Sequence, residues 1–261
     1  MSRVIVVTGS TRGIGLGLAR AFAAQGCRVV VNGRRPEAVG AALAALPVSD
    51  GLRPAGVAAD IASRDDAARL WREAEALTGR VDVWINNAGR GMSIATQALT
   101  DDDFDEMMRV NVKSALYGMQ TAVAHFQERG TGHVINVSSL LGRVPFATFR
   151  SAYCAAKHAL NALTACLRVD VSRSHPGVHV STVSPGVVAT EFGVNAIGGG
   201  PDSRTMPGSQ TAEEVAAVIL DVIEHPRADA YTRPGAREMI AAYYAAEDVA
   251  ELEKGWMAAP R

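Results

Sequence analysis

The sequence has few cysteines, few aromatic residues and almost no net charge. Its 261 residues include three cysteines, Cys27, Cys154 and Cys166, with no C-x-x-C spacing. That argues against a disulfide framework and a zinc site, so we expect a reducing compartment and no bound metal. Lysine and arginine number 26 against 27 aspartates and glutamates, a formal charge of −1. No overall charge draws the chain to nucleic acid or anionic lipid, and neither is expected as a partner.

The sequence also lacks a long hydrophobic run near its start. Four consecutive apolar residues, 4–7, precede Thr8 and Gly9, too few for the core of a signal peptide or for a membrane span. We therefore predict a cytoplasmic location and no membrane contact. With 48% hydrophobic residues, no internal repeat and no low-complexity linker, the chain is expected to form one domain.

Short β-branched runs alternate with longer stretches of helical composition. This alternation is typical of βαβ units, in which helices cover both faces of a parallel sheet. The predicted strands are 4–7, 29–32, 54–59, 81–86, 133–138, 178–184 and 230–233. The predicted helices are 14–24, 36–46, 63–77, 101–128, 152–174 and 212–223. The fold class is thus α/β, with a seven-stranded, mainly parallel, doubly wound sheet over residues 1–261.

Two further local patterns bear on this organisation. Thr211 with Glu214 has the spacing of a capping box, and Ser63 and Thr100 are expected N-caps. Residues 186–209 are rich in glycine and proline, and a long connection of this kind inside a compact domain is usually functional. We predict a flexible substrate loop there.

A glycine-rich turn joins the first strand directly to the first helix. Glycines at such a turn allow a pyrophosphate to approach the backbone, and the free N–H groups and dipole of the helix start favour its charge. The spacing is G-x-x-x-G-x-G rather than G-x-G-x-x-G, but the strand-turn-helix context predicts a Rossmann-type dinucleotide site. Its predicted cofactor-binding residues are Gly9, Ser10, Thr11, Arg12, Gly13, Ile14 and Gly15.

The end of the second strand indicates which dinucleotide is bound. An acid there would bind the ribose 2′-hydroxyl of NAD, but the strand ends in Gly33, Arg34 and Arg35. Arginine instead pairs with a 2′-phosphate through its planar donors, and Arg12 adds a second charge. The sequence therefore favours NADP over NAD.

Tyr153 and Lys157 lie four residues apart in the predicted helix 152–174. They share one face, so the ammonium can lie near the phenol and lower its pKa. A free tyrosine titrates near about 10, so a lowered pKa would make it a better proton donor and base at neutral pH. The pair is a candidate acid–base site.

Several motifs of the sequence together resemble those of the short-chain dehydrogenase/reductase family. They are the glycine turn, Asn86-Asn87-Ala88-Gly89, Asn111, Ser138-Ser139, the Tyr153 and Lys157 pair, and Pro185-Gly186. The resemblance extends to about Thr190, weakens in the last sixty or so residues, and is nearest to the NADP-dependent carbonyl and 3-oxoacyl reductases. It implies that Tyr153 is the general acid and base, Ser139 polarises the carbonyl oxygen, Lys157 also binds the nicotinamide ribose, and Asn111 holds a relay water. The further cofactor contacts that it implies are Asp60, Ile61, Asn87, Ala88, Gly89, Pro185, Gly186, Val188 and Thr190.

Three positions leave alternatives open. Ser139 lies fourteen residues before Tyr153, one more than the family pattern, so Ser138 remains the alternative to Ser139. Arg90 adds a positive group near the pocket, although a surface charge is its simpler interpretation. Cys154, beside the tyrosine, is expected to pack rather than to act in redox chemistry.

The predicted function is NADP-dependent hydride transfer between nicotinamide and a ketone or secondary alcohol. The alternatives are a non-catalytic NADP-binding sensor or scaffold, and a nucleotide-sugar epimerase or dehydratase of the same fold. The expected pocket segments, 90–95, 140–150 and 187–209, favour an apolar or moderately polar carbonyl compound over a highly charged one. Apolar residues spread around the helices from Asp101 and Ala152 predict a homodimer or homotetramer. These residues are Met107, Met108, Tyr117, Met119, Phe126, Leu160, Leu163, Cys166 and Val169.

Overall fold

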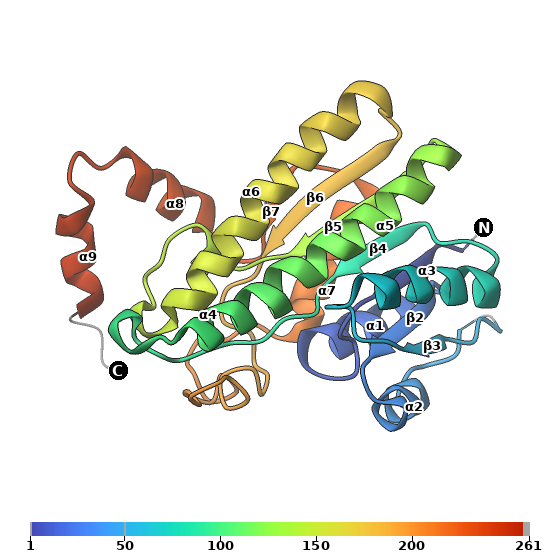
Figure 1. Ribbon diagram of the computed structural model, residues 1–261, viewed down its shortest axis with the longest axis horizontal. Coiled ribbons are helices and arrows are strands. Elements are labelled where there is room, and N and C mark those ends of the chain that lie inside the picture. The colour runs from blue at the N-terminus through green and yellow to red at the C-terminus, as the bar shows by residue number, and fades with distance from the viewer. Residues whose placement is uncertain (1, 50, 258–261) are drawn as a thin grey trace.

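The computed structural model describes residues 2–49 and 51–257 and contains one seven-stranded sheet between two layers of helices (Figure 1). The strand order is β3-β2-β1-β4-β5-β6-β7, and each neighbouring pair is parallel. The predicted α/β fold class is confirmed. The strands are β1 (Val4–Val7), β2 (Arg28–Gly33), β3 (Ala55–Ala58), β4 (Val83–Asn86), β5 (Gly132–Val137), β6 (Val178–Ser184) and β7 (Asp229–Tyr231).

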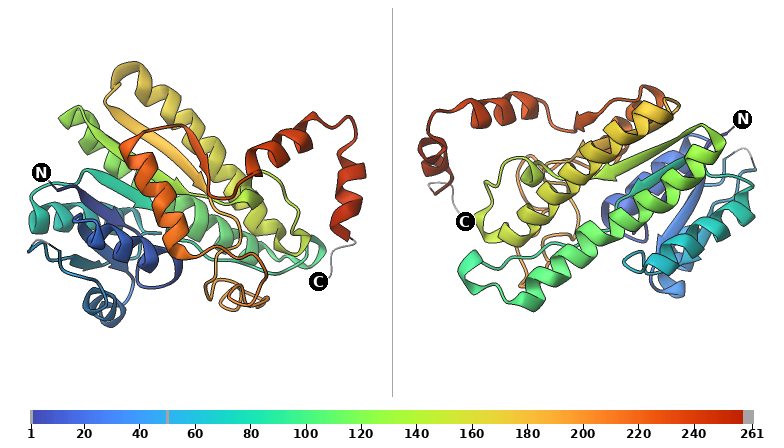
Figure 2. Two further views of the ribbon diagram at one scale, coloured as in Figure 1. Left: turned by 180° about the vertical axis from the view of Figure 1, so that it is seen from behind. Right: turned by 45° about the horizontal axis from the view of Figure 1, so that its top comes forward.

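The helices divide between the two faces of the sheet. One face carries α1 (Gly13–Ala24), α2 (Pro36–Ala44) and α7 (Ala212–Glu224). The other carries α3 (Arg64–Thr78), α5 (Ser114–Arg129) and α6 (Ser151–Ser174). The first layer faces the viewer in the left panel of Figure 2 and the second in Figure 1.

Side-chain alternation in β1 shows why this strand is apolar throughout. Ile5 and Val7 pack with Phe22 of α1 in one core, whereas Val4 and Val6 pack in the other. Successive side chains of a strand point to opposite faces, so a strand covered on both sides buries every residue. The continuous hydrophobic run in the sequence follows directly from this position.

Helix starts agree with the sequence, but one predicted helix is interrupted. Thr211 and Glu214 form the expected capping box, and Ser63 and Thr100 accept hydrogen bonds as N-caps. The predicted helix 101–128 is instead α4 (Asp101–Met108), a π-helical turn (Arg109–Lys113) and α5. The prediction of one continuous helix was wrong because hydrophobic periodicity does not detect a single wide turn.

Two helices near the C-terminus were not predicted. They are α8 (Ala236–Ala245) and α9 (Val249–Met257), and Figure 1 shows them as an arm extending beyond the edge of the sheet. Ile240 and Ala236 of α8 pack on Leu140 and Val144. Among the described residues, no helix is long and apolar enough to span a membrane, and no three His, Cys, Asp or Glu side chains gather as a metal site.

The strand order reverses direction between β1 and β4. In a doubly wound sheet, loops on either side of such a point lead to opposite faces and leave a crevice at the carboxyl ends of the strands. The glycine turn after β1 and the loop after β4 border this crevice. The fold therefore places the predicted dinucleotide site at the switch point.

Candidate active site

A cleft of about 1140 Å³ lies at the carboxyl ends of the strands. Thr8 Oγ1 joins its two sides, because it accepts hydrogen bonds from the backbone N–H of Asn87 at 3.0 Å and of Ala88 at 3.1 Å. Asn32 Oδ1, at the end of β2, accepts the N–H of Gly9 at 3.2 Å. Three neighbouring strands thus fix the glycine turn in place.

The turn requires glycine at Gly9 and Gly15. Gly9 has φ +62°, and a Cβ there would lie 2.8 Å from Cα of Ala88. A Cβ at Gly15 would lie 2.5 Å from Nδ2 of Asn87, the group that donates to the carbonyl of Thr8 at 2.9 Å. Ala88 and Asn87 therefore occupy the space that side chains at Gly9 and Gly15 would need. Gly13, with φ +56°, is the exposed glycine of the turn, and its backbone is open to a ligand such as a pyrophosphate.

The end of β2 is basic and closely packed. The exposed side chains of Arg12, Arg34 and Arg35 border the cleft. A Cβ at Gly33 would lie 2.5 Å from the methyl group of Thr11, so the packing does not accommodate the acid that NAD-binding proteins place near this position. The lack of an acid at Gly33 has a steric reason as well as an electrostatic one.

The predicted adenine contact, Asp60, also borders the cleft. Its Oδ1 accepts the N–H of Ala62 at 3.1 Å, and its Oδ2 lies 3.7 Å from Nη1 of Arg109. Arg109 also binds Glu106 at 2.8 Å, and this bond holds the pKa of Glu106 below its ordinary value. The carboxylates at this end of the cleft are thus balanced by a shared arginine.

Tyr153 is buried in the first turn of α6, with 7% of its surface exposed. Burial raises the pKa of its phenol to about 12, while a hydrogen bond with the Ser139 hydroxyl and the charge of Arg150 act in the opposite direction. The expected lowering of the pKa by Lys157 is not found. In this structure desolvation outweighs the nearby charges, so the phenol keeps its proton at neutral pH.

Lys157 lies on the same face of α6, as its spacing predicted. Its Nζ is 5.7 Å from the centre of the Tyr153 ring and donates to the carbonyl of Val137 at 3.0 Å. Burial lowers the pKa of Lys157 to about 8. The lysine is therefore held by the end of β5 and is easily deprotonated.

Ser138 and Ser139 occupy different surroundings. Ser139 Oγ accepts the N–H of Leu141 at 3.1 Å in addition to its contact with Tyr153. Ser138 is buried and borders the cleft, and its hydroxyl has no hydrogen-bond partner among the described residues. The contact with the phenol favours Ser139 as the residue beside the reacting group.

Asn111 lies in the π-helical turn between α4 and α5. Its Nδ2 donates to the carbonyl of Arg90 at 3.0 Å and to that of Met107 at 3.2 Å, and its Oδ1 accepts the N–H of Arg90. The side chain thus fixes the backbone of the β4–α4 loop at the cleft. Arg90 itself is exposed at the cleft border.

Most of the predicted site residues lie together in this cleft. Those that border it are Gly9, Thr11, Arg12, Gly13, Ile14, Gly15, Arg34, Arg35, Asp60, Ile61, Asn87, Ala88, Gly89, Asn111, Tyr153, Lys157 and Thr190. Five others are not among its lining residues: Ser10, Ser139, Pro185, Gly186 and Val188. Ser10 is fully buried, where it donates to the carbonyl of Val7 and accepts the N–H of Asn32.

Sequence reasoning missed a buried amide network behind the site. Asn86 Oδ1 accepts Nε1 of Trp84 at 2.8 Å, Asn86 Nδ2 donates to Asn136 at 2.8 Å, and Asn136 Nδ2 donates to Thr164 of α6 at 2.9 Å. This chain joins β4, β5 and α6 and so fixes the helix that carries Tyr153. The polar residues inside apolar strands were the available signal, because a buried amide needs partners.

Cys154 packs in the interior, as expected. Burial raises the pKa of its thiol to about 11, which disfavours the reactive thiolate.

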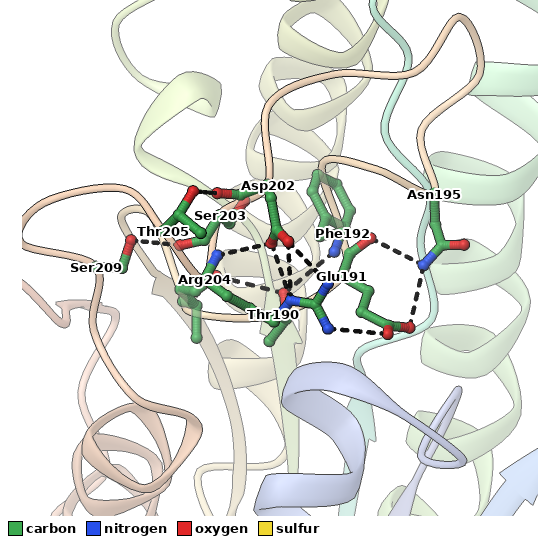
Figure 3. Close-up of polar contacts among 10 residues, drawn as sticks. Thr190, Glu191, Phe192, Asn195, Asp202, Ser203, Arg204, Thr205 and Ser209 are labelled. Carbon is green, nitrogen blue, oxygen red and sulfur yellow. Dashed lines mark hydrogen bonds and ion pairs between the residues drawn. The ribbon is translucent and has the colours of Figure 1, made fainter.

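The segment 190–209 covers the cleft next to Tyr153. Its Ile197 exchanges backbone hydrogen bonds with Gly91 and Ser93, and Arg204 pairs with Asp202 at 2.7 Å and with Glu191 at 3.1 Å (Figure 3). The ring of Phe192 lies against Tyr153, with 5.4 Å between the ring centres. The predicted substrate loop therefore forms one wall beside the phenol, while its flexibility stays a prediction.

Comparison with known families agrees with this geometry. Residues 3–197 match the family model described as short chain dehydrogenase. The chain belongs to the short-chain dehydrogenase family. Members of this family are oxidoreductases, and the match covers the glycine turn, the Asn111 turn and the Tyr153 helix but not the C-terminal arm.

Three proteins that are similar to this chain differ in sequence identity and in how much of each chain is covered. The uncharacterized oxidoreductase YxnA of Bacillus subtilis is 32% identical over 88% of this chain, which spans only 65% of that protein. The D-beta-hydroxybutyrate dehydrogenase of Cupriavidus necator is 27% identical over 98% of both chains. A short-chain dehydrogenase from Burkholderia cenocepacia, solved in complex with NADP, has a TM-score of 0.78 and 25% identity and covers 99% of this chain and 98% of its own.

Proposed function

We infer that this protein transfers a hydride between NADP(H) and a ketone or secondary alcohol. The observation that carries this conclusion is the position of Tyr153, hydrogen-bonded to Ser139 and next to buried Lys157, in the same cleft as a glycine turn and three arginines. The NADP complex of the Burkholderia cenocepacia protein and the name of the Cupriavidus necator dehydrogenase support it.

The residues of the cleft fit an NADP molecule. The backbone at Gly13 is exposed where a pyrophosphate would lie, and Arg12 and Arg34 suit a 2′-phosphate. Asp60 and Ile61 would hold the adenine, and Lys157 the ribose next to the nicotinamide. When bound, the nicotinamide supplies or accepts the hydride. The remaining contacts, assigned to the adenosine and carboxamide ends, are Asn87, Ala88, Gly89, Pro185, Gly186, Val188 and Thr190.

The protein groups manage the proton of the reaction. Tyr153, with a pKa of about 12, keeps its proton at neutral pH and donates it to the carbonyl oxygen during reduction. Ser139 orients the phenol and polarises the same oxygen. Arg150 stabilises the phenolate that remains. Asn111, which borders the cleft, is assigned to hold a water that extends the proton relay to solvent.

Kinetic assay of one tyrosine variant tests the function. NADPH oxidation is measured by absorbance with a panel of ketones, comparing the unmodified protein with Tyr153→Phe. We expect the variant to lose at least about a hundredfold in turnover while it still binds NADPH, because general acid catalysis contributes roughly that much. Tyr117→Phe makes the same chemical change on α5, where the ring packs against Arg64. Equal turnover by Tyr153→Phe and Tyr117→Phe would refute the mechanism.

A further inference from the structure

Arg150 is a buried cation directly before the helix that carries Tyr153. Only 7% of its surface is exposed, and its Nη1 is buried without a hydrogen-bond partner among the described residues. In residues 2–49 and 51–257, none of the acidic side chains lies within ion-pair distance of its guanidinium. The positive charge of the buried Arg150 guanidinium is therefore not compensated by a carboxylate of the described chain.

Aromatic rings and glycines surround the guanidinium. Its central carbon lies 5.4 Å from the centre of the Phe149 ring and 5.5 Å from that of Phe192. A Cβ at Gly91 would lie 2.7 Å from Nη1, and one at Gly200 would lie 3.3 Å from Nη2. Two loops distant in sequence thus come close to the arginine at positions that carry no side chain.

Burying an unpaired guanidinium costs free energy, so the surroundings of Arg150 bear on its role. A buried cation without a partner loses its hydration, and cation–π contacts recover only part of that free energy. Buried charges are therefore normally paired. Arg150 is not itself among the residues that line the cleft, but Gly91 and Phe192, which lie against its guanidinium, both border it. An anion in the cleft at these two residues would supply the missing partner. Guanidinium donors match a carboxylate in shape and bind it through two parallel hydrogen bonds.

The arginine lies close enough to the reacting group to act on the same small molecule. Arg150 and Tyr153 are three residues apart at the start of α6, and the Phe192 ring packs against both. The free N–H groups at the start of this 24-residue helix add positive potential on the same side. The charge of Arg150 also acts on the Tyr153 phenol, so an anion held at the arginine lies near the reacting group.

We propose that Arg150 binds the carboxylate of the substrate and that the substrate is a short oxo acid, reduced to the hydroxy acid. The proposal rests on the proposed function and names its substrate class. The ketone carbon takes one hydride from NADPH and its oxygen takes one proton from Tyr153, while the carboxylate is unchanged. The sequence alone favoured an apolar or moderately polar carbonyl compound over a highly charged one, because nothing in it shows that Arg150 is buried.

A matched pair of substrates tests the proposal kinetically. The unmodified protein is assayed with NADPH and either 3-oxobutanoate or its methyl ester, which differ in the carboxylate charge. We expect kcat/KM for the acid to exceed that for the ester by at least about tenfold, the effect of one charge-assisted hydrogen bond. Equal values, or a preference for the ester, would overturn the assignment.

Two variants distinguish a specific contact between Arg150 and the carboxylate from a general effect of removing one positive charge. Arg150→Met should lower kcat/KM for the acid at least about tenfold more than for the ester, because both substrates lose the charge that favours the phenolate and only the acid loses a carboxylate partner. NADPH affinity should stay within about threefold. Arg72→Met, a change of the same charge on the exposed face of α3, should keep the preference. An equal loss on acid and ester in Arg150→Met would assign the arginine to structure and contradict the proposal.

Binding of an unreactive acid distinguishes this proposal from the proposed function. Calorimetry with butanoate and butanamide is carried out on the protein saturated with NADP. Binding of butanoate that is at least about tenfold tighter than butanamide, and lost in Arg150→Met, supports the carboxylate subsite even if no ketone is reduced. Turnover of neutral ketones without preferential binding of butanoate would uphold the proposed function and overturn the subsite.

Discussion

At the scale of single residues, burial sets the chemistry of the candidate site. Tyr153 and Lys157 are both buried, and desolvation moves their pKa values in opposite directions, to about 12 and about 8. The tyrosine therefore holds its proton more firmly than in water, and the lysine less firmly. The neutral phenol is suited to carbonyl reduction, which consumes a proton.

The lowered pKa of Lys157 predicts a pH-dependent affinity for NADPH. The lysine is charged below about pH 8 and loses its proton above it, so a contact with the nicotinamide ribose weakens as the pH rises. We expect fluorescence titrations to show NADPH affinity falling between about pH 7 and about pH 9. Lys157→Met should bind more weakly at pH 7 and lack this transition. The same pH profile in both proteins would show that another group is responsible.

At the scale of elements, the ends of strands and the starts of helices carry the function. The end of β2 supplies the basic groups, and its tight contact with Thr11 is part of the same turn. A variant that places an acid at Gly33 would disturb this packing as well as the charge. Cofactor preference is therefore better tested at Arg34, which is exposed.

Arg34→Ala should weaken NADPH binding by about tenfold or more and leave NADH binding unchanged. The arginine is assigned to the 2′-phosphate, which only NADPH carries, and one charge-assisted hydrogen bond is worth on the order of 1.5–3 kcal/mol. Calorimetric titration at fixed moderate salt measures both affinities, and Arg72→Ala is the control of equal charge. If the unmodified protein binds NADH as tightly as NADPH, the assignment of the arginines is wrong.

At the scale of the whole molecule, one buried histidine at the opposite end of the sheet makes stability depend on pH. His133 of β5 hydrogen-bonds the Ser181 hydroxyl at 2.8 Å, and Ser181 donates to the carbonyl of Arg227. Because the serine has one hydrogen, His133 Nε2 must be the donor. Burial, with the nearby His179 and Arg3, lowers the pKa of His133 to about 3.

Acid should therefore destabilise the fold through His133. Unfolded histidine titrates near about 6.5, so between that pH and about 3 the unfolded chain binds more protons, and stability is lost as the pH falls. The contribution amounts to about 2 kcal/mol between pH 7 and pH 5. In urea unfolding, His133→Gln should lose less stability over this range than the unmodified protein, while His225→Gln, at an exposed site, should behave like the unmodified protein. Equal losses in His133→Gln would contradict the assignment.

Fewer of the residues named in the assembly prediction are exposed than expected, and the assembly itself stays a prediction. Met107, Met119, Phe126 and Leu160 are buried within their own chain, whereas others on α6 remain exposed. Figures 1 and 2 show α5 and α6 running beside each other on one side of the molecule, which gives an extended helical surface for a second copy. The exposed α6 residues are Leu163, Cys166 and Val169.

We predict a homodimer or homotetramer that uses this surface. Light scattering at micromolar concentration should give at least twice the mass of one chain, and Val169→Glu should shift it towards the mass of one chain by placing a charge in the contact. Val48→Glu, at an exposed apolar position after α2, should have no effect. A monomer in the unmodified protein would refute the prediction.

The sequence by itself determined the sheet, the glycine turn and the Tyr153-Lys157 pair, because each depends on residues close together in the chain. A strand buried on both faces is apolar throughout, a capping box has fixed spacing, and residues four apart share a helix face. Only the tertiary structure decided that burial raises the pKa of Tyr153, that Asn111 lies in a π-helical turn and that Arg150 has no carboxylate partner among the described residues. Those properties depend on desolvation and on contacts between distant segments, such as Gly91 and Phe192 around α6, which no local pattern records.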